Sequence, residues 1–168
     1  MRLFFSVLLV VFLSQSAFGA EIDQVVWNHP GYSITVHRTG EVRVDFVQNQ
    51  KGISRELIES SFSGYPKDKF RESLAGPERL KRLFQLIDSS DWTQVKASYR
   101  AAEGTFEYAG HETVTRLVLK SKGTVVKEVE LGGSRKPDWP TFVLETVDDI
   151  VALATEDGRQ LPRGPFLD

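Results

Sequence analysis

Apolar and polar residues alternate in two short segments on either side of a glycine turn. Apolar side chains occupy every second position of residues 32–36 and again of residues 42–46, and Thr39-Gly40 lies between the two segments. A period of two around a glycine turn is typical of two antiparallel strands with one buried face. Gly40 suits a turn position with positive φ, which other residues resist. The pattern therefore predicts a β-hairpin over residues 32–46.

A second hairpin and two amphipathic helices follow further along the chain. Residues 113–120 and 124–131 are predicted strands, joined across Ser121-Lys122-Gly123. One helix begins at Pro77 and runs to Asp88, and a second begins at Asp138 or Trp139. The apolar stripe is Leu80, Leu83, Phe84 and Ile87 in the first helix and Phe142, Val143, Val147, Ile150, Val151 and Ala154 in the second.

The pattern is weaker between residues 48 and 76. Residues 54–61 fit a short helix, and Pro66 then disfavours helical backbone at Tyr65. Residues 67–74 fit one or two further helical turns. We interpret this region as an insertion of mixed loop and helix.

The order of hairpin, helix, hairpin and helix predicts an α+β fold. Two amphipathic helices can bury their stripes against one face of a sheet. The expected architecture is a two-layer sandwich, in which a four-stranded antiparallel sheet from the two hairpins carries the two main helices on one face. Residues 20–157 would form this single domain, and residues 158–168 an extended C-terminal tail.

The first 19 residues have the pattern of a signal peptide. Arg2 precedes a mostly apolar run over residues 3–13, which is too short to span a bilayer, and Ala17-Phe18-Gly19 places small residues before a cut after Gly19. A cut after Ala20 would put the bulky Phe18 three residues before it. The alternative is an uncleaved anchor. We predict export to the periplasm or the medium, with no stable membrane insertion after cleavage.

Composition narrows the classes of function. Cleavage after Gly19 removes one basic residue, Arg2, and changes the formal net charge from −2 to −3. Nucleic-acid-binding proteins are usually strongly basic, so we expect no nucleic-acid partner. The chain has no cysteine, which excludes disulfides and thiol chemistry. A domain of this size buries enough surface to fold without disulfides.

The segment Pro30-Gly31-Tyr32-Ser33-Ile34-Thr35-Val36, followed by Gly40 and Val42, resembles the opening hairpin of a family of uncharacterised secreted bacterial domains. Those domains begin with Cys-Pro-x-Tyr and continue through a helix, a second hairpin and a final helix. The resemblance covers roughly residues 23–154 and implies the fold and an exported location, but no activity. This chain has Asn28-His29 before Pro30, so no role of the family's cysteines transfers to it.

One loop is a candidate for binding an anion. Gly132, Gly133, Ser134, Arg135 and Lys136 form a glycine-rich, basic segment that leads into the second helix. Free backbone N–H groups at a helix start favour anions. The segment matches neither a phosphate loop nor a dinucleotide fingerprint. The alternative is a flexible connection between strand and helix.

Three aromatic residues and the distribution of charge suggest contact surfaces. Trp27, Tyr65 and Trp139 lie in segments that resemble loops or ends, where aromatics either bind a partner or cover the edge of a core. Basic residues dominate around the first helix, whereas residues 138–157 carry acidic residues and no basic one. If the two helices lie side by side, these flanks would face each other.

The sequence contains no recognisable catalytic, cofactor or metal-binding set. His29, His37 and His111 lack the short spacing of a zinc site, so we predict no metal and no cofactor. The favoured hypothesis is a non-enzymatic exported binding module of the bacterial envelope, with another envelope or secreted protein as its partner. The alternative is a small exported hydrolase built on His29 or His111 with nearby carboxylates. A histidine clustered with two carboxylates in one pocket would favour the hydrolase.

Overall fold

The protein forms one large β-sheet with helices on one side of it. The computed structural model describes residues 20–46, 55–62, 64–100 and 113–163. Seven strands are arranged in the order β4-β3-β2-β1-β6-β7-β5, and every neighbouring pair is antiparallel except β5 and β7, which are parallel. The strands are β1 (Gln24–His29), β2 (Tyr32–His37), β3 (Glu41–Phe46), β4 (Phe70–Leu74), β5 (Ser98–Tyr99), β6 (Val114–Ser121) and β7 (Thr124–Gly132).

Both predicted hairpins are present. β2 and β3 pair from Tyr32 opposite Phe46 to Val36 opposite Val42. Gly40 lies in the turn between them with a φ of 105°, a conformation that glycine adopts without strain. β6 and β7 pair along their length, with one register shift after Leu119. Alternation located β2 and β3 correctly, and β6 and β7 match the strands predicted over residues 113–120 and 124–131 to within one residue at each end.

The predicted four-stranded antiparallel sheet with two helices is nevertheless wrong. The sheet has seven strands and is mixed, and there are three α-helices, although the α+β class is confirmed. β1 lies between β2 and β6 and joins the two hairpins into one sheet. β4 occupies residues for which one or two helical turns were expected, and β5 adds a two-residue parallel edge.

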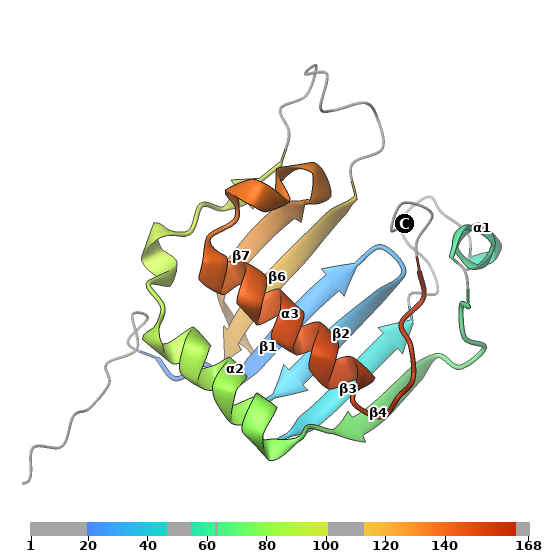
Figure 1. Ribbon diagram of the computed structural model, residues 1–168, viewed down its shortest axis with the longest axis horizontal. Helices are drawn as coiled ribbons and strands as arrows, with labels where there is room; N and C mark the ends of the chain where they lie inside the picture. The colour runs from blue at the N-terminus through green and yellow to red at the C-terminus, as the bar shows by residue number, and fades with distance from the viewer. Residues whose placement is uncertain (1–19, 47–54, 63, 101–112, 164–168) are drawn as a thin grey trace, which may run out of the picture.

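Two of the helices lie against one face of the sheet (Figure 1). α3 (Thr141–Thr155) crosses in front of β1, β2 and β3, and α2 (Pro77–Ser89) packs beside it. α1 (Arg55–Ser61) lies apart, near the β4 edge. Short 3₁₀ helices, η1 (Trp92–Gln94) and η2 (Gly133–Asp138), follow α2 and β7. No helix in the described ranges is both long and apolar enough to cross a bilayer.

The core fills the space between this sheet face and the two helices. Leu83, Phe84 and Ile87 of α2 and Val143, Ile150 and Leu153 of α3 are at most 3% exposed, as are Ile34, Val36, Val42, Val44, Leu117 and Leu119 of the sheet. Trp92 is fully buried, and its indole N–H donates to the Ile87 carbonyl at 3.0 Å. The C-terminal segment also contributes, because Leu161 packs against the core and Pro162 is buried.

The opposite face of the sheet is largely polar. Thr35, Arg43 and Glu72 are neighbours across β2, β3 and β4, and the Arg43 guanidinium donates to Glu72 at 2.8 Å. Side chains on this face alternate with the core positions, as expected for a sheet with one dry side. Val26 and Val118 are buried apolar exceptions on this face, paired across β1 and β6 with 8% and 7% of their surface exposed, whereas the apolar side chains of Phe70, Leu74 and Val125 are exposed.

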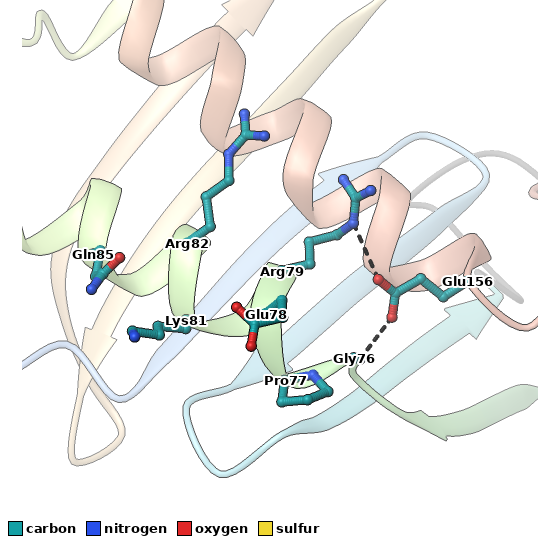
Figure 2. A pocket seen from close by; sticks show the side chains of 8 residues that line it. All are labelled: Gly76, Pro77, Glu78, Arg79, Lys81, Arg82, Gln85 and Glu156. Carbon is teal, nitrogen blue, oxygen red and sulfur yellow. Dashed lines mark hydrogen bonds and ion pairs between the residues drawn. The ribbon is translucent and has the colours of Figure 1, made fainter.

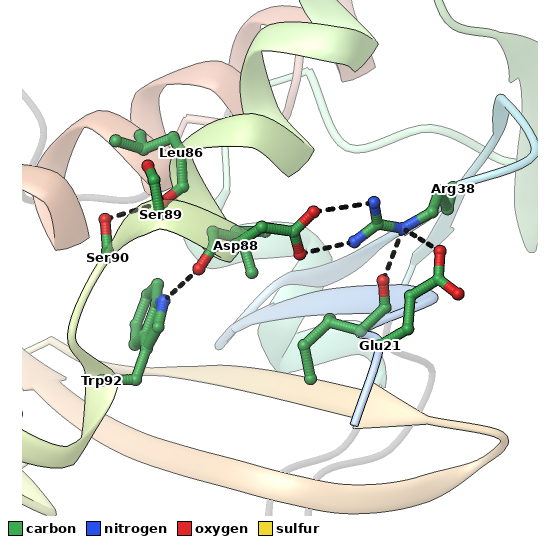
Figure 3. Close-up of polar contacts among 9 residues, drawn as sticks. Glu21, Arg38, Leu86, Asp88, Ser89, Ser90 and Trp92 are labelled. Carbon is green, nitrogen blue, oxygen red and sulfur yellow. Dashed lines mark hydrogen bonds and ion pairs between the residues drawn. The ribbon is translucent and has the colours of Figure 1, made fainter. Parts of the chain in front are cut away.

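An arginine in the β2–β3 turn connects the start of the domain to α2 (Figure 3). The Arg38 guanidinium donates to both carboxylate oxygens of Asp88 at 2.8 and 3.0 Å and to the Ile22 carbonyl at 2.7 Å. It also lies over the Phe84 ring, 4.4 Å from the centroid. Bidentate pairing combined with stacking suits arginine and not lysine.

Candidate functional site

A cavity of about 480 Å³ lies between the sheet, η2 and α3. Cavities of roughly 300–1,000 Å³ are typical of small-molecule sites. The lining residues are Trp27, His29, Thr113, Thr115, Gly133, Lys136, Trp139, Val147, Asp148, Val151, Ala152 and Thr155. Five of them, Trp27, His29, Gly133, Lys136 and Trp139, were singled out from the sequence, but as parts of three separate hypotheses.

The lining follows from strand and helix periodicity. On β1, Val25, Trp27 and His29 alternate toward the helices, so the strand directs two aromatic rings to one side. Trp27 is opposite Leu117 of β6, which places Thr115 beside His29 on the same face. α3 supplies the other wall through Val147, Val151 and their neighbours at helical spacing.

Two indole N–H groups of this lining lack hydrogen-bond acceptors. Trp27 is 9% exposed and Trp139 is half-buried, and the Nε1 atom of each is buried without a partner in the described part of the chain. Most buried polar groups in native proteins are hydrogen-bonded. By contrast, Trp92, the third tryptophan, donates to the Ile87 carbonyl. Among the described residues, the buried ring N–H groups without an acceptor are thus those of the two tryptophans on the cavity lining, and both nitrogen atoms are closed off from water.

His29 is the third aromatic ring on this lining. Its ring is stacked on Tyr32 with centroids 4.5 Å apart, and only 6% of the residue is exposed. Burial lowers the pKa of His29 to about 4, so the ring is neutral near pH 7. Its Nδ1 accepts a hydrogen bond from the Gly31 N–H at 3.3 Å, which leaves the ring proton on Nε2. No acceptor among the described residues contacts this Nε2–H.

Two opposite charges lie among the lining residues without pairing. Lys136 and Asp148 are both exposed, and neither forms an ion pair with any described residue. Two of the three lining threonines already donate their hydroxyl hydrogen to a backbone carbonyl: Thr115 to Leu131 at 3.3 Å and Thr155 to Val151 at 3.0 Å.

The predicted anion loop has a defined structure. Gly132 ends β7, and residues 133–138 form η2, not the flexible connection given as the alternative. The Gly133 N–H donates to the Thr113 carbonyl at 3.1 Å, and Arg135 pairs with Asp138. The Gly133 N–H and the Arg135 guanidinium, two groups that the hypothesis assigns to an anion, thus already have partners within the protein. Gly133 and Lys136 are both part of the cavity lining. Anion binding by residues 132–136, Ser134 included, stays a prediction.

The three candidate contact aromatics do not form one surface. Trp27 is buried in β1, where no strand was predicted, so it presents little surface to a protein partner. Tyr65 packs edge-on against Phe46 and Phe62, outside the cavity lining. Trp139 follows η2 and lines the cavity beside Lys136. Sequence reasoning missed the α3 wall as part of a site, because those residues have the pattern of core positions.

The hydrolase alternative finds little support in this geometry. The cavity brings His29 together with a single carboxylate, Asp148. His111 lies outside the described residues. Among the described residues, no three metal-ligating side chains cluster.

A second hollow, at the start of α2, is a shallow surface built from charged side chains (Figure 2). Arg79 contacts Asp149 at 3.3 Å and Glu156 at 3.1 Å, and Arg82 contacts Asp149 at 3.2 Å. Glu156 also accepts the Gly76 N–H at 2.7 Å, next to the free N–H groups of the helix start. The predicted facing of basic and acidic helix flanks is confirmed, and these groups hold α2 against α3.

No family model, curated protein or solved structure matches the chain. The resemblance to secreted bacterial domains therefore stays a prediction.

Proposed function

We propose that this protein is an exported, non-enzymatic binding module that holds a small molecule in the cavity between β1, β6 and α3. The observation that carries the proposal is a cavity of about 480 Å³ that combines two tryptophan rings with an apolar α3 wall and two charged side chains, Lys136 and Asp148. Export rests on the signal-peptide pattern of residues 1–19, which lie outside the described residues.

Binding fits the lining better than catalysis does. The α3 wall is apolar at Val147, Val151 and Ala152, and the cavity's histidine is neutral and has one exposed carboxylate on the same lining. Hydrolysis by acid–base catalysis needs a titrating group poised near the working pH. With a pKa of about 4, His29 is far from that range.

The proposal is tested with an apolar fluorescent probe, N-phenyl-1-naphthylamine, and the mature chain 20–168. We expect saturable binding at one site. Ala152→Leu adds volume to the α3 wall and should weaken binding at least about tenfold, which is roughly 1.4 kcal/mol. Glu145→Leu, which adds the same side chain at an exposed position of α3, should leave the affinity unchanged.

Circular dichroism and thermal unfolding of each variant establish that it is folded. Equal affinity of the folded Ala152→Leu variant and the parent chain would contradict the proposed site, as would the absence of saturable probe binding.

A further inference from the structure

Strand β4 forms one edge of the sheet, and its outer side has no partner strand in the described part of the chain (Figure 1). Just after the strand, the Ala75 N–H donates to the Gly40 carbonyl at 2.8 Å. Backbone hydrogen bonds of an antiparallel pair use every second residue, so Ser73 and Arg71 also bond to β3. The other residues of β4 direct their backbone N–H and C=O groups outward: Phe70, Glu72 and Leu74.

The two charged side chains of this edge are engaged within their own molecule. Charges on an edge strand normally oppose its pairing with another chain. Here the Arg43 guanidinium donates to Glu72 at 2.8 Å, and Arg71 donates to the Ala154 carbonyl at the end of α3 at 2.7 Å.

The same edge presents apolar side chains to water. Four large apolar side chains are exposed among the described residues, and the five residues of β4 carry two of them. Phe70 is 46% exposed and Leu74 is 83% exposed. The edge therefore offers a partner free backbone groups and apolar surface, while its charges are already paired.

Strand β4 is complementary to itself when two copies run antiparallel. With Glu72 opposite Glu72 of the second copy, Phe70 lies opposite Leu74 and the long Arg71 lies opposite the small Ser73. All three outward-facing residues then form hydrogen-bonded pairs, and both exposed apolar side chains gain an apolar neighbour across the strands. A shift of two residues in either direction would instead place Glu72 opposite an apolar side chain.

We infer that two copies of this chain pair through β4 in this register, which joins their two sheets into one continuous sheet. This surface is separate from the proposed cavity between β1, β6 and α3. Because only one short strand from each copy forms the contact, the dimer should be weak and dissociate in the range of about 10–500 μM.

Sedimentation equilibrium of the mature chain 20–168 over a range of concentrations measures the dissociation constant of the dimer. Phe70→Glu and Leu74→Lys each disrupt an apolar pair at both ends of the symmetric contact, so each should weaken the dimer about tenfold or more. Val125→Lys is the matched control, because it changes an exposed apolar residue of β7, at the other side of the sheet. That variant should leave the constant unchanged, and thermal unfolding establishes that each variant is folded.

Two further measurements test the register. Glu72→Gln removes the like charges that face each other across the two-fold axis, so it should tighten the dimer about threefold or more. A mixture of the Phe70→Glu and Leu74→Lys variants places the introduced carboxylate opposite the introduced ammonium and retains one apolar pair. The mixed dimer should therefore form more tightly than either variant forms a dimer with itself.

A chain that remains monomeric up to about 1 mM would overturn the inference. A dimer that Phe70→Glu and Leu74→Lys leave equally tight would overturn it as well, because the contact would then lie elsewhere. A dimer that these variants weaken, but that neither Glu72→Gln tightens nor the mixture restores, would show that the assigned register is wrong.

Discussion

At the scale of single residues, His29 shows how burial selects a protonation state. The ring lies between Tyr32, which stacks on it, and Phe62, which meets it edge-on. Burial lowers the pKa of His29 to about 4 and raises that of Tyr32 to about 12, because each neutral form is easier to bury. Tyr32 therefore does not titrate in the range where His29 would.

The depressed pKa of His29 predicts a dependence of stability on pH. Between the ordinary histidine value of about 6.5 and the folded value of about 4, the unfolded chain binds a proton that the folded chain does not. The free energy of unfolding should therefore fall as the pH is lowered through this window, by about 2–3 kcal/mol at pH 4.5 relative to pH 7.

Urea unfolding at both pH values measures this loss, and His29→Gln is the control. Glutamine retains an acceptor for the Gly31 N–H and does not titrate, so the loss between pH 7 and 4.5 should be smaller by most of that amount. Other groups, such as Asp157 with its pKa lowered by Arg159, contribute equally to both proteins. An identical pH dependence of the two proteins would contradict the assignment.

Single residues of the site were only partly predictable from the sequence. Trp27 and Trp139 were noticed as aromatics in apparent loops, and Lys136 as part of a basic loop. Nothing in the sequence placed the three together, because the strand β1 that carries Trp27 was not recognised. The apolar wall at Val147 and Val151 has the periodicity of a packed helix face, and only the tertiary structure reveals that a space remains beside it.

At the scale of elements, the contact between α2 and α3 depends on a buried carboxylate. Asp148 and Asp149 are consecutive residues of α3 that differ in burial. Asp148 is exposed, but the Asp149 side chain is 3% exposed because it faces α2, where Arg79 and Arg82 reach it. Both arginines stay in partial contact with water, with 41% and 64% of their side chains exposed.

Because the carboxylate is buried and the arginines are partly solvated, removing the two arginines should lower the free energy of unfolding more than removing the carboxylate charge does. Replacing both arginines by glutamine leaves a buried carboxylate without a cation and should lower the free energy of unfolding by about 2–3 kcal/mol, less than for a fully buried pair because water partly screens the arginines. Asp149→Asn frees arginines that water can solvate and should cost about 1 kcal/mol.

Urea denaturation of the two variants measures both costs. Glu156→Gln is a further control, because Arg79 also pairs with Glu156. The cost of losing that pair is subtracted from the cost of replacing Arg79. A larger loss for Asp149→Asn than for the double arginine variant would show that the carboxylate is not effectively buried.

The strands that the sequence failed to predict lack a local signal for physical reasons. In β1, Val25, Val26 and Trp27 are all buried, because Val26 is covered on the face away from the helices, so the apolar run does not alternate. β4 is a polar edge strand whose exposed Leu74 breaks any simple pattern. Its strand conformation comes from pairing with β3, which a local sequence window does not contain.

At the scale of the whole molecule, the first described residues, directly after the predicted signal peptide, are part of the packed domain. Ile22 is fully buried in the core, and its carbonyl accepts the Arg38 side chain that also binds Asp88 at the end of α2 (Figure 3). Asp23 continues the connection by accepting the Lys122 N–H of the β6–β7 turn at 2.9 Å. The segment before β1 thus joins both hairpins and α2.

Because of these contacts, the stability of the domain depends on where the predicted signal peptide is cut. A chain that begins at Ala20, the residue after the predicted cut, retains Ile22 and should be fully stable. A chain that begins at Gln24 loses the burial of Ile22 and the acceptor of Arg38, and its free energy of unfolding should fall by about 2–4 kcal/mol or more. Ile22→Ala in the chain 20–168 should reproduce most of this loss, since a cavity replaces the side chain.

Urea unfolding of the three chains measures these differences, and intact-mass measurement of the protein recovered from the envelope of a bacterial host locates the natural cut. A mature mass beginning at Ala20 or Glu21 is compatible with the buried Ile22, whereas a product beginning at or beyond Gln24 would exclude the predicted site. Recovery of the uncleaved chain would support the anchor instead. The residues just past the predicted cut therefore matter for stability, because without them Arg38 loses the Ile22 carbonyl that holds its guanidinium beside Asp88.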